Sequence, residues 1–201
     1  MSYNLLKGKK GLIFGALNEQ SIAWKVAERA VEEGAEIVLT NTAVSIRMGT
    51  ISKLAEKCNT IVVPADATSV GDLENLIDKT MEHFGGKFDF MLHSIGMSPN
   101  VRKGRTYDDL DYDFLSKTLD ISAISFHKAI QVARKKDAIN DWGSIVALSY
   151  ILLFGVQGII TKGLLGLHVD IYGRLGLWIV QTVTFFPYAY SVIYGVMKGI
   201  S

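Results

Sequence analysis

The feature that most constrains this fold is a regular alternation of short apolar segments and amphipathic helical segments over residues 1–150. We expect strands at 11–15, 36–40, 60–64, 88–93 and 144–148, and helices at 21–33, 51–57, 73–84 and 112–136. Strands that alternate with helices at this spacing predict a parallel sheet joined by right-handed crossovers. The sequence therefore favours an α/β fold with a doubly wound sheet.

Composition narrows the classes of function. The 201-residue chain carries 21 basic and 20 acidic residues, for a net charge of +1. A nucleic-acid binder usually shows a strong positive field, so we expect no nucleic-acid partner. One cysteine, Cys58, excludes an intrachain disulfide and favours a reducing compartment, and we expect a cytoplasmic location. The four histidines lack ligand spacing, so we expect no metal site.

The character of the chain changes at Tyr150. Of the 41 charged residues, only Lys162, Asp170, Arg174 and Lys198 follow it. We therefore divide the chain into a domain over 1–150 and an atypical apolar tail over 151–201.

Candidate site residues lie just after each expected strand, because a doubly wound sheet binds ligands beyond the carboxyl ends of its strands. Gly15 follows the first strand and lets the backbone turn tightly and approach a phosphate. The helix that begins at Ser21 offers free N–H groups, and Ser21 itself is suited to cap that helix or to donate to a phosphate. A G-x-G-x-x-G motif is absent, so a plain loop with a serine cap stays open as an alternative.

The third strand is followed by Asp66, whose carboxylate is suited to accept a hydrogen bond from an adenine amino group while the Ala67 N–H pairs with the ring. The alternative is an aspartate that only forms a turn. The second strand ends at 40–42 without an acidic residue for a ribose 2′-hydroxyl, and the nearest basic residue, Arg47, lies farther on. NADH is therefore favoured over NADPH. We interpret His93 as a buried structural histidine.

Five segments carry a resemblance to a known family: KGKKGLIFGALNEQSIAWKVAERAVEEGAEIVLTN, PADATSVGDLENLI, FDFMLHSIGMSPN, DLDYDFLSKTLDISAISF and GSIVALSY. Together they resemble the enoyl-acyl-carrier-protein reductase of bacterial fatty-acid synthesis, a divergent short-chain dehydrogenase/reductase. The likeness covers residues 1–150, and SIAW, HSIG and LSY are its most specific parts. It implies a Rossmann-type sheet that binds NADH and reduces the trans-2 double bond of an acyl chain on acyl carrier protein. A homotetramer is also implied.

The resemblance assigns roles by position. The residues that match its cofactor contacts are Gly15, Ser21 and Ile22 at the phosphates and nearby ribose, Thr42 at the adenosine half, Asp66 and Ala67 at adenine, and Ile95 beside the cofactor. Ser98 matches a position near the acyl substrate. Tyr150 matches the first of two active-site tyrosines.

The resemblance stops at Tyr150. The family continues with a second tyrosine that hydrogen-bonds the developing enolate and a lysine that binds the ribose. Here those positions hold Ile160 and Leu167, and the pair Tyr194 and Lys198 lies too far along the chain to replace them. We therefore expect an NADH-dependent reductase by lineage whose catalysis is impaired. The alternative is a non-catalytic dinucleotide-binding module or pseudoenzyme.

Three interpretations of the tail stay open. The uncharged segment Leu175–Met197 is long enough to span a membrane, although Pro187 and Gln181 weaken that reading. A diverged but folded replacement is the second interpretation. The third, which we prefer, is a shifted reading frame after a lesion near codon 151. On any of them, the parallel sheet is expected to be incomplete at its C-terminal end.

Overall fold

A computed structural model describes residues 2–106 and 108–147. The chain divides into two units, Met1–Ser149 and Tyr150–Ser201, and the fold below is that of the first unit. The predictions for Tyr150, Ile160, Leu167 and the tail over 151–201 lie outside the described residues. Within the described ranges, no helix combines the length and apolar character needed to cross a membrane.

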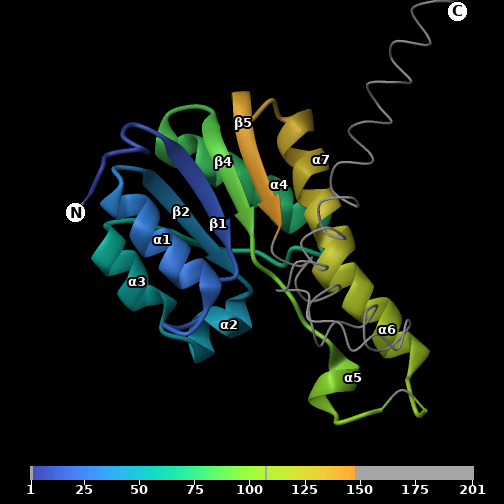
Figure 1. The fold of residues 1–201 in the computed structure, drawn as a ribbon. Coiled ribbons are helices and arrows are strands. Elements are labelled where there is room, and N and C mark those ends of the chain that lie inside the picture. Colours follow the sequence, from blue (N-terminus) through green and yellow to red (C-terminus); the bar gives the residue numbers. More distant parts are fainter. Residues whose placement is uncertain (1, 107, 148–201) are drawn as a thin grey trace, which may run out of the picture. The chain divides into compact units, whose positions relative to one another are not determined.

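Strands and helices alternate along the described chain (Figure 1). The strands are β1 (Lys10–Phe14), β2 (Glu36–Asn41), β3 (Val62–Pro64), β4 (Phe88–His93) and β5 (Ile139–Ala147). The helices are α1 (Ile22–Glu32), α2 (Ala43–Met48), α3 (Ile51–Cys58), α4 (Val70–Phe84), α5 (Pro99–Arg102), α6 (Tyr112–Leu119) and α7 (Ser125–Lys135), with a π-helical turn, η1 (Asp120–Ile124), between the last two.

The five strands form one parallel sheet in the order β3-β2-β1-β4-β5. The chain builds outward from β1 through β2 to β3, then returns to the other side of β1 for β4 and β5. This reversal makes a switch point between β1 and β4, where loops leaving the two strands diverge. The prediction of a Rossmann-type, doubly wound α/β fold is confirmed for the described residues.

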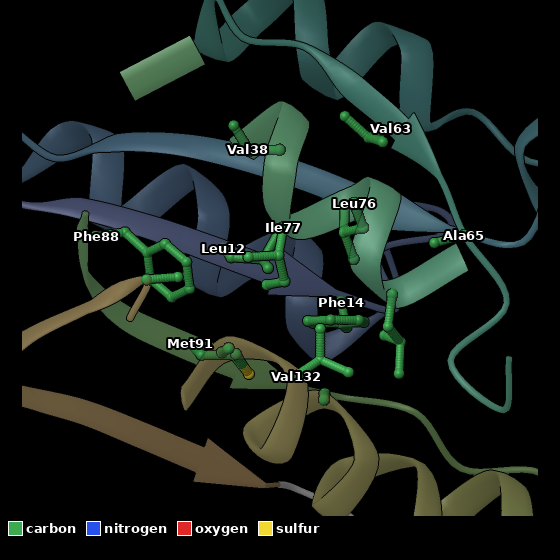
Figure 2. Packing of buried hydrophobic residues seen from close by; sticks show 14 of the residues in the cluster. Leu12, Phe14, Val38, Val63, Ala65, Leu76, Ile77, Phe88, Met91 and Val132 are labelled. Carbon is green, nitrogen blue, oxygen red and sulfur yellow. The ribbon is translucent and has the colours of Figure 1, made fainter. Parts of the chain in front are cut away.

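The sheet is buried on both faces, as a parallel sheet requires. Along β1, Leu12 and Phe14 join an apolar cluster with residues of α4 and α7, whereas Ile13 joins a second cluster with α1 and α3. Figure 2 shows the first cluster, in which Leu76 and Ile77 of α4 face the strands. Alternation along each strand therefore supplies two cores, one beneath each helical layer.

Two features depart from the expected elements. The helix expected over 112–136 is divided by η1, where the Ser125 N–H donates to the Asp120 carbonyl across five residues. The strand expected at 144 begins at Ile139 and carries an irregularity between its pairings with Phe88 and Phe90. Trp142 lies in that irregularity with φ +63°, and the turn-like residues around it hid the early start of the strand.

Two short helices, α2 and α5, were not expected at all. Each begins with a side-chain cap, from Thr42 and Ser98 respectively, and each is too short to show helical periodicity in the sequence. One residue separates α2 from β2, and the loop over 94–98 separates α5 from β4. Both helices therefore lie beyond the carboxyl ends of strands, where ligands bind in this fold.

Candidate functional site

A cleft of about 470 Å³ lies at the carboxyl ends of the strands, where the loops after β1, β2, β3 and β4 meet. Four of the predicted site residues line it together: Gly15, Thr42, Asp66 and Ile95. A neighbouring hollow of about 460 Å³ shares Thr42, Val44 and Asp66 with the cleft and extends the concave surface toward α4. Both volumes lie in the range of small-molecule sites, roughly 300–1,000 Å³.

Gly15 lines the cleft with backbone alone. Its φ of +90° lies in the region that favours glycine, and its N–H donates to the Thr40 carbonyl at 3.1 Å. A Cβ at this position would overlap the Ser94 carbonyl, which comes from the loop after β4. Glycine therefore lets the loops after β1 and β4 touch, and it leaves bare backbone facing the cleft.

Asp66 forms the turn that was the alternative interpretation from the sequence, and its role at adenine stays a prediction. Its Oδ1 accepts hydrogen bonds from the Thr68 N–H at 2.9 Å and the Thr68 hydroxyl at 2.7 Å, so the aspartate does form a turn. Its own N–H donates to Asp72 Oδ2 at 2.9 Å. Asp66 still lines the cleft, and the bonds just described leave its Oδ2 unengaged within the described residues.

The loop after β2 is held by Asn41, which lies in the candidate segment 40–42 but received no role from the sequence. Asn41 donates from Nδ2 to the Ala16 carbonyl at 2.9 Å, and its Oδ1 accepts from the Thr42 N–H at 2.9 Å. It thereby ties the loop after β2 to the loop after β1. Thr42 in turn caps α2, accepting from the Ser45 N–H. Both Asn41 and Thr42 line the cleft.

Ser21 does not cap α1 with its side chain. Its Oγ instead accepts from the Leu17 N–H at 3.1 Å and the Asn18 N–H at 3.3 Å, and it donates to the Asn18 carbonyl. The serine therefore shapes the loop that precedes the helix. Ser21 and Ile22 both lie outside the set of residues that line the cleft, and their contact with a dinucleotide stays a prediction.

Ala67 and Ser98 also lie outside the lining of the cleft. The Ala67 side chain is buried in the core beneath α4. Ser98 accepts from the Val101 N–H at the start of α5 and accepts a second, long bond from the Thr118 hydroxyl at 3.4 Å. Each has a structural reason for its place, and the roles predicted for them at adenine and at the acyl chain stay predictions.

Charged residues from the α5–α7 region complete the cleft, and sequence reasoning assigned them no role. They are Arg102 on α5, Lys117 on α6 and Asp120 at the start of η1. Lys117 and Asp120 both belong to the DLDYDFLSKTLDISAISF segment that carries the resemblance, but neither residue was assigned a role. Arg102 lies outside the five segments, and only the folded chain brings it to the cleft on α5.

His93 ends β4 and is fully buried, with 0% of its surface exposed. Its Nε2 lies 3.0 Å from the Ser125 hydroxyl, while its Nδ1 has no hydrogen-bond partner among the described residues. Burial lowers the pKa of His93 to about 4, so the ring is neutral at pH 7. His93 does not line the cleft, which agrees with the interpretation of a structural histidine.

Comparisons with known proteins converge on one family. The model of a family described as "Enoyl-(Acyl carrier protein) reductase" matches residues 15–159, and so runs past Tyr150, where the resemblance was expected to stop. An enoyl-[acyl-carrier-protein] reductase [NADH] of Rickettsia felis is 36% identical over 166 residues, which cover 81% of this chain and 60% of that protein. A second reductase of that name, from Rhizobium meliloti, is 31% identical over 146 residues, which cover 73% of this chain and 53% of that protein.

Solved structures agree. The crystal structure of a FabI–NADH complex from Alistipes finegoldii is 97% identical, with a TM-score of 0.73, over 75% of this chain and 53% of that chain. An enoyl-[acyl-carrier-protein] reductase (NADH) from Aquifex aeolicus is 27% identical, with a TM-score of 0.62, over 70% of this chain and 55% of that chain. The chain thus spans little more than half the length of the relatives it matches.

Proposed function

This chain belongs to the enoyl-acyl-carrier-protein reductase family, and on that premise we propose that it binds NADH in the cleft and reduces the trans-2 double bond of an enoyl chain on acyl carrier protein. One observation carries the proposal: residues from four separate strand ends, predicted as cofactor contacts, meet in one cleft. The names of the relatives, which are NADH-dependent reductases, favour an enzyme over a non-catalytic module.

The residues present fit an extended dinucleotide. Gly15 lines the cleft and has no side chain, which suits a pyrophosphate that needs close approach to the backbone. Thr42 and Asp66 line both the cleft and the neighbouring hollow, and they offer hydroxyl and carboxylate oxygens to an adenosine. Ile95, which also packs against the core, gives an apolar surface for the rest of the cofactor.

The same surfaces support NADH over NADPH. A 2′-phosphate needs a cation near the end of β2, and the residues there that line the cleft are Asn41, Thr42, Val44 and Ser45. Arg47 lies in the last turn of α2 and lines neither the cleft nor the neighbouring hollow.

Bound NADH supplies the hydride that adds to the β-carbon of the enoyl thioester. We propose that Tyr150, which matches the first of the family's two active-site tyrosines, is the catalytic side chain that this chain retains. Ile160 and Leu167 stand where the family has its second tyrosine and its lysine, and neither can donate a hydrogen bond from its side chain. We therefore expect a rate at least about a hundredfold below that of a complete relative, as for the loss of one such donor.

Membership of this family also supports three proposals about the substrate carrier, the cellular location and the assembly of the chain. The acyl chain reaches the site on acyl carrier protein, the chain acts in the cytoplasm, and it assembles as a homotetramer. Size-exclusion chromatography with light scattering tests the last of these, since a monomer would contradict it.

The decisive experiment separates binding from turnover. The purified full chain is titrated with NADH, whose fluorescence changes when it is bound, and is then mixed with NADH and a crotonyl thioester while the absorbance of reduced nicotinamide is followed. We expect saturable binding and slow turnover. Binding with no turnover above the protein-free control supports the non-catalytic module. A chain that stays folded and does not bind NADH contradicts both functions.

A further inference from the structure

Lys128 of α7 links two segments that line the cleft, the loop after β3 and the π-helical turn η1. Its Nζ donates to the Thr68 carbonyl at 2.9 Å and to Asp120 Oδ1 at 2.9 Å. Thr68 belongs to the loop after β3, and Asp120 opens the π-helical turn η1. Both acceptors belong to residues that line the cleft, whereas Lys128 does not.

The π-helical turn η1 also contacts a third segment that lines the cleft, the loop after β4. Ser122 of η1 is fully buried, and its hydroxyl accepts from the Met97 N–H at 3.1 Å in the loop after β4. The turn thus contacts the loop after β4 directly and the loop after β3 through Lys128. Loss of the lysine would leave the loop after β3 without this link to η1.

Charge gives Lys128 a second effect on the cleft. The Asp120 carboxylate lines a site proposed to take a dinucleotide with two negative phosphates. Its ion pair with Lys128 is only partly sheltered, with 26% of the lysine side chain and 41% of the aspartate side chain exposed, so solvent weakens it somewhat less than a fully open surface pair. The lysine therefore holds the carboxylate in place and offsets its repulsion of an anion.

We propose that Lys128 is a positioning residue for the dinucleotide: it fixes the loop after β3, which carries Asp66, against the π-helical turn, and so prepares the cleft for binding. This inference rests on the proposed function, and it adds a residue outside the cleft to those that set its affinity. Lys128 touches no ligand on this view and acts through Thr68 and Asp120.

Lys128→Met tests the proposal, because it keeps the apolar stem and removes the charge and its donors. Lys136→Met is the matched control, since Lys136, the residue after α7, makes a comparable bond to Asp78 of α4 at 2.7 Å and lines no part of the cleft. We expect Lys128→Met to weaken NADH binding about fivefold and to speed amide exchange at Thr68 and Ser69 in the ligand-free chain. Lys128→Arg should restore most of the affinity, and Lys136→Met should bind as the unmodified chain does.

Equal NADH affinity in Lys128→Met and the unmodified chain would overturn the inference and leave the proposed function standing. Equal weakening by both methionine variants would also overturn it, because the effect would then be one of general stability. If the unmodified chain itself does not bind NADH, the proposed function fails and this inference fails with it.

Discussion

The α1/α3 layer and the α6–η1–α7 junction are built in different ways on the same sheet. Beneath α1 and α3 the buried cluster is formed by apolar side chains and one cysteine, and it includes Ile13, Trp24 and Leu54. At the junction, the fully buried side chains include Thr118, Ser122 and Ser125, each of which makes a hydrogen bond. Packing holds the first region, whereas directed polar bonds hold the second and the loops beside the cleft.

The largest expected effect tests the apolar layer. Leu54→Ala removes a fully buried side chain and should lower the free energy of unfolding by about 3 kcal/mol, through lost burial and the cavity left behind. Urea unfolding followed by circular dichroism measures it. Leu5→Ala, at a side chain that is 76% exposed, is the control and should change stability by less than about 0.5 kcal/mol. Similar losses in both variants would contradict a layer held by packing.

The second prediction concerns His93, which contacts Ser125 at the polar junction, and the pH dependence of the free energy of unfolding. Burial holds the pKa of His93 at about 4 in the folded chain, against 6.5 for the free group. Protonation therefore favours the unfolded chain. The contribution of neutral His93 to the free energy of unfolding is therefore fully present above pH 6.5. It decreases as the pH falls from 6.5 toward 4, and it does not change further below pH 4. The full loss is about 3 kcal/mol as an upper bound.

His93→Gln isolates this effect, because glutamine keeps a hydrogen-bonding group but does not titrate. The free energy of unfolding is measured from pH 7.5 to 3.5 for both proteins, and the difference between them carries the contribution of His93 alone. We expect this difference to change steadily between pH 6.5 and 4. A difference that is constant with pH would show that His93 is not held neutral by burial.

The same contrast explains how much the sequence could predict. The continuous apolar run over Leu12, Ile13 and Phe14 predicted a buried strand, and its residues do join the clusters on both faces of the sheet. The strand β4 was predicted with its observed bounds over 88–93. The π-helical turn was missed because its residues keep helical periodicity, and one shifted hydrogen bond leaves no trace in the pattern. Packing repeats at a fixed period along the chain, and polar bonds between distant loops do not.

The site was predictable to the same degree. Gly15 and Asp66 follow strands, so topology alone places them at one edge of the sheet. Asn41 is the last residue of β2, but its role depends on reaching the Ala16 carbonyl, 25 residues away in the sequence. Lys117 reaches the cleft only through the position of α6. Strand ends thus placed Gly15 and Asp66 at the cleft, whereas Ala67 and Ser98, which were also predicted for the site, do not line it. Tertiary contacts, which leave no pattern in the sequence, decide the other positions.

The third prediction tests one directed bond at the junction. Ser122→Ala leaves the Met97 N–H without its acceptor and should cost about 1–2 kcal/mol of stability. Amide exchange at Met97 should become faster, because the bond that protects it is lost. Thr80→Ala serves as the control, since Thr80 is equally buried and its hydroxyl donates only within α4, to the Leu76 carbonyl. Unchanged exchange at Met97 would remove η1 as the support of the loop after β4.

The smallest expected effect concerns an ion pair on the surface of the α1/α3 layer. Glu28 of α1 accepts from Lys57 of α3 at 2.7 Å and from the Trp24 indole at 3.0 Å. The hydrogen bond from Lys57 is the main reason that the pKa of Glu28 falls to about 2 from 4.5. The contribution of ionised Glu28 to the free energy of unfolding is therefore fully present above pH 4.5, and it is lost as the pH falls toward 2.

Glu28→Gln should cost about 1 kcal/mol at pH 7, well below what that pKa implies, because the Lys57 side chain is 64% exposed and solvent screens the pair. The measurement is urea unfolding of both proteins at pH 7 and at pH 3, with and without 0.5 M salt. We expect the difference between them to shrink with acid and with salt. A loss near 3 kcal/mol that salt does not reduce would show that directed polar bonds hold this layer as well, and the contrast between the two regions would then fail.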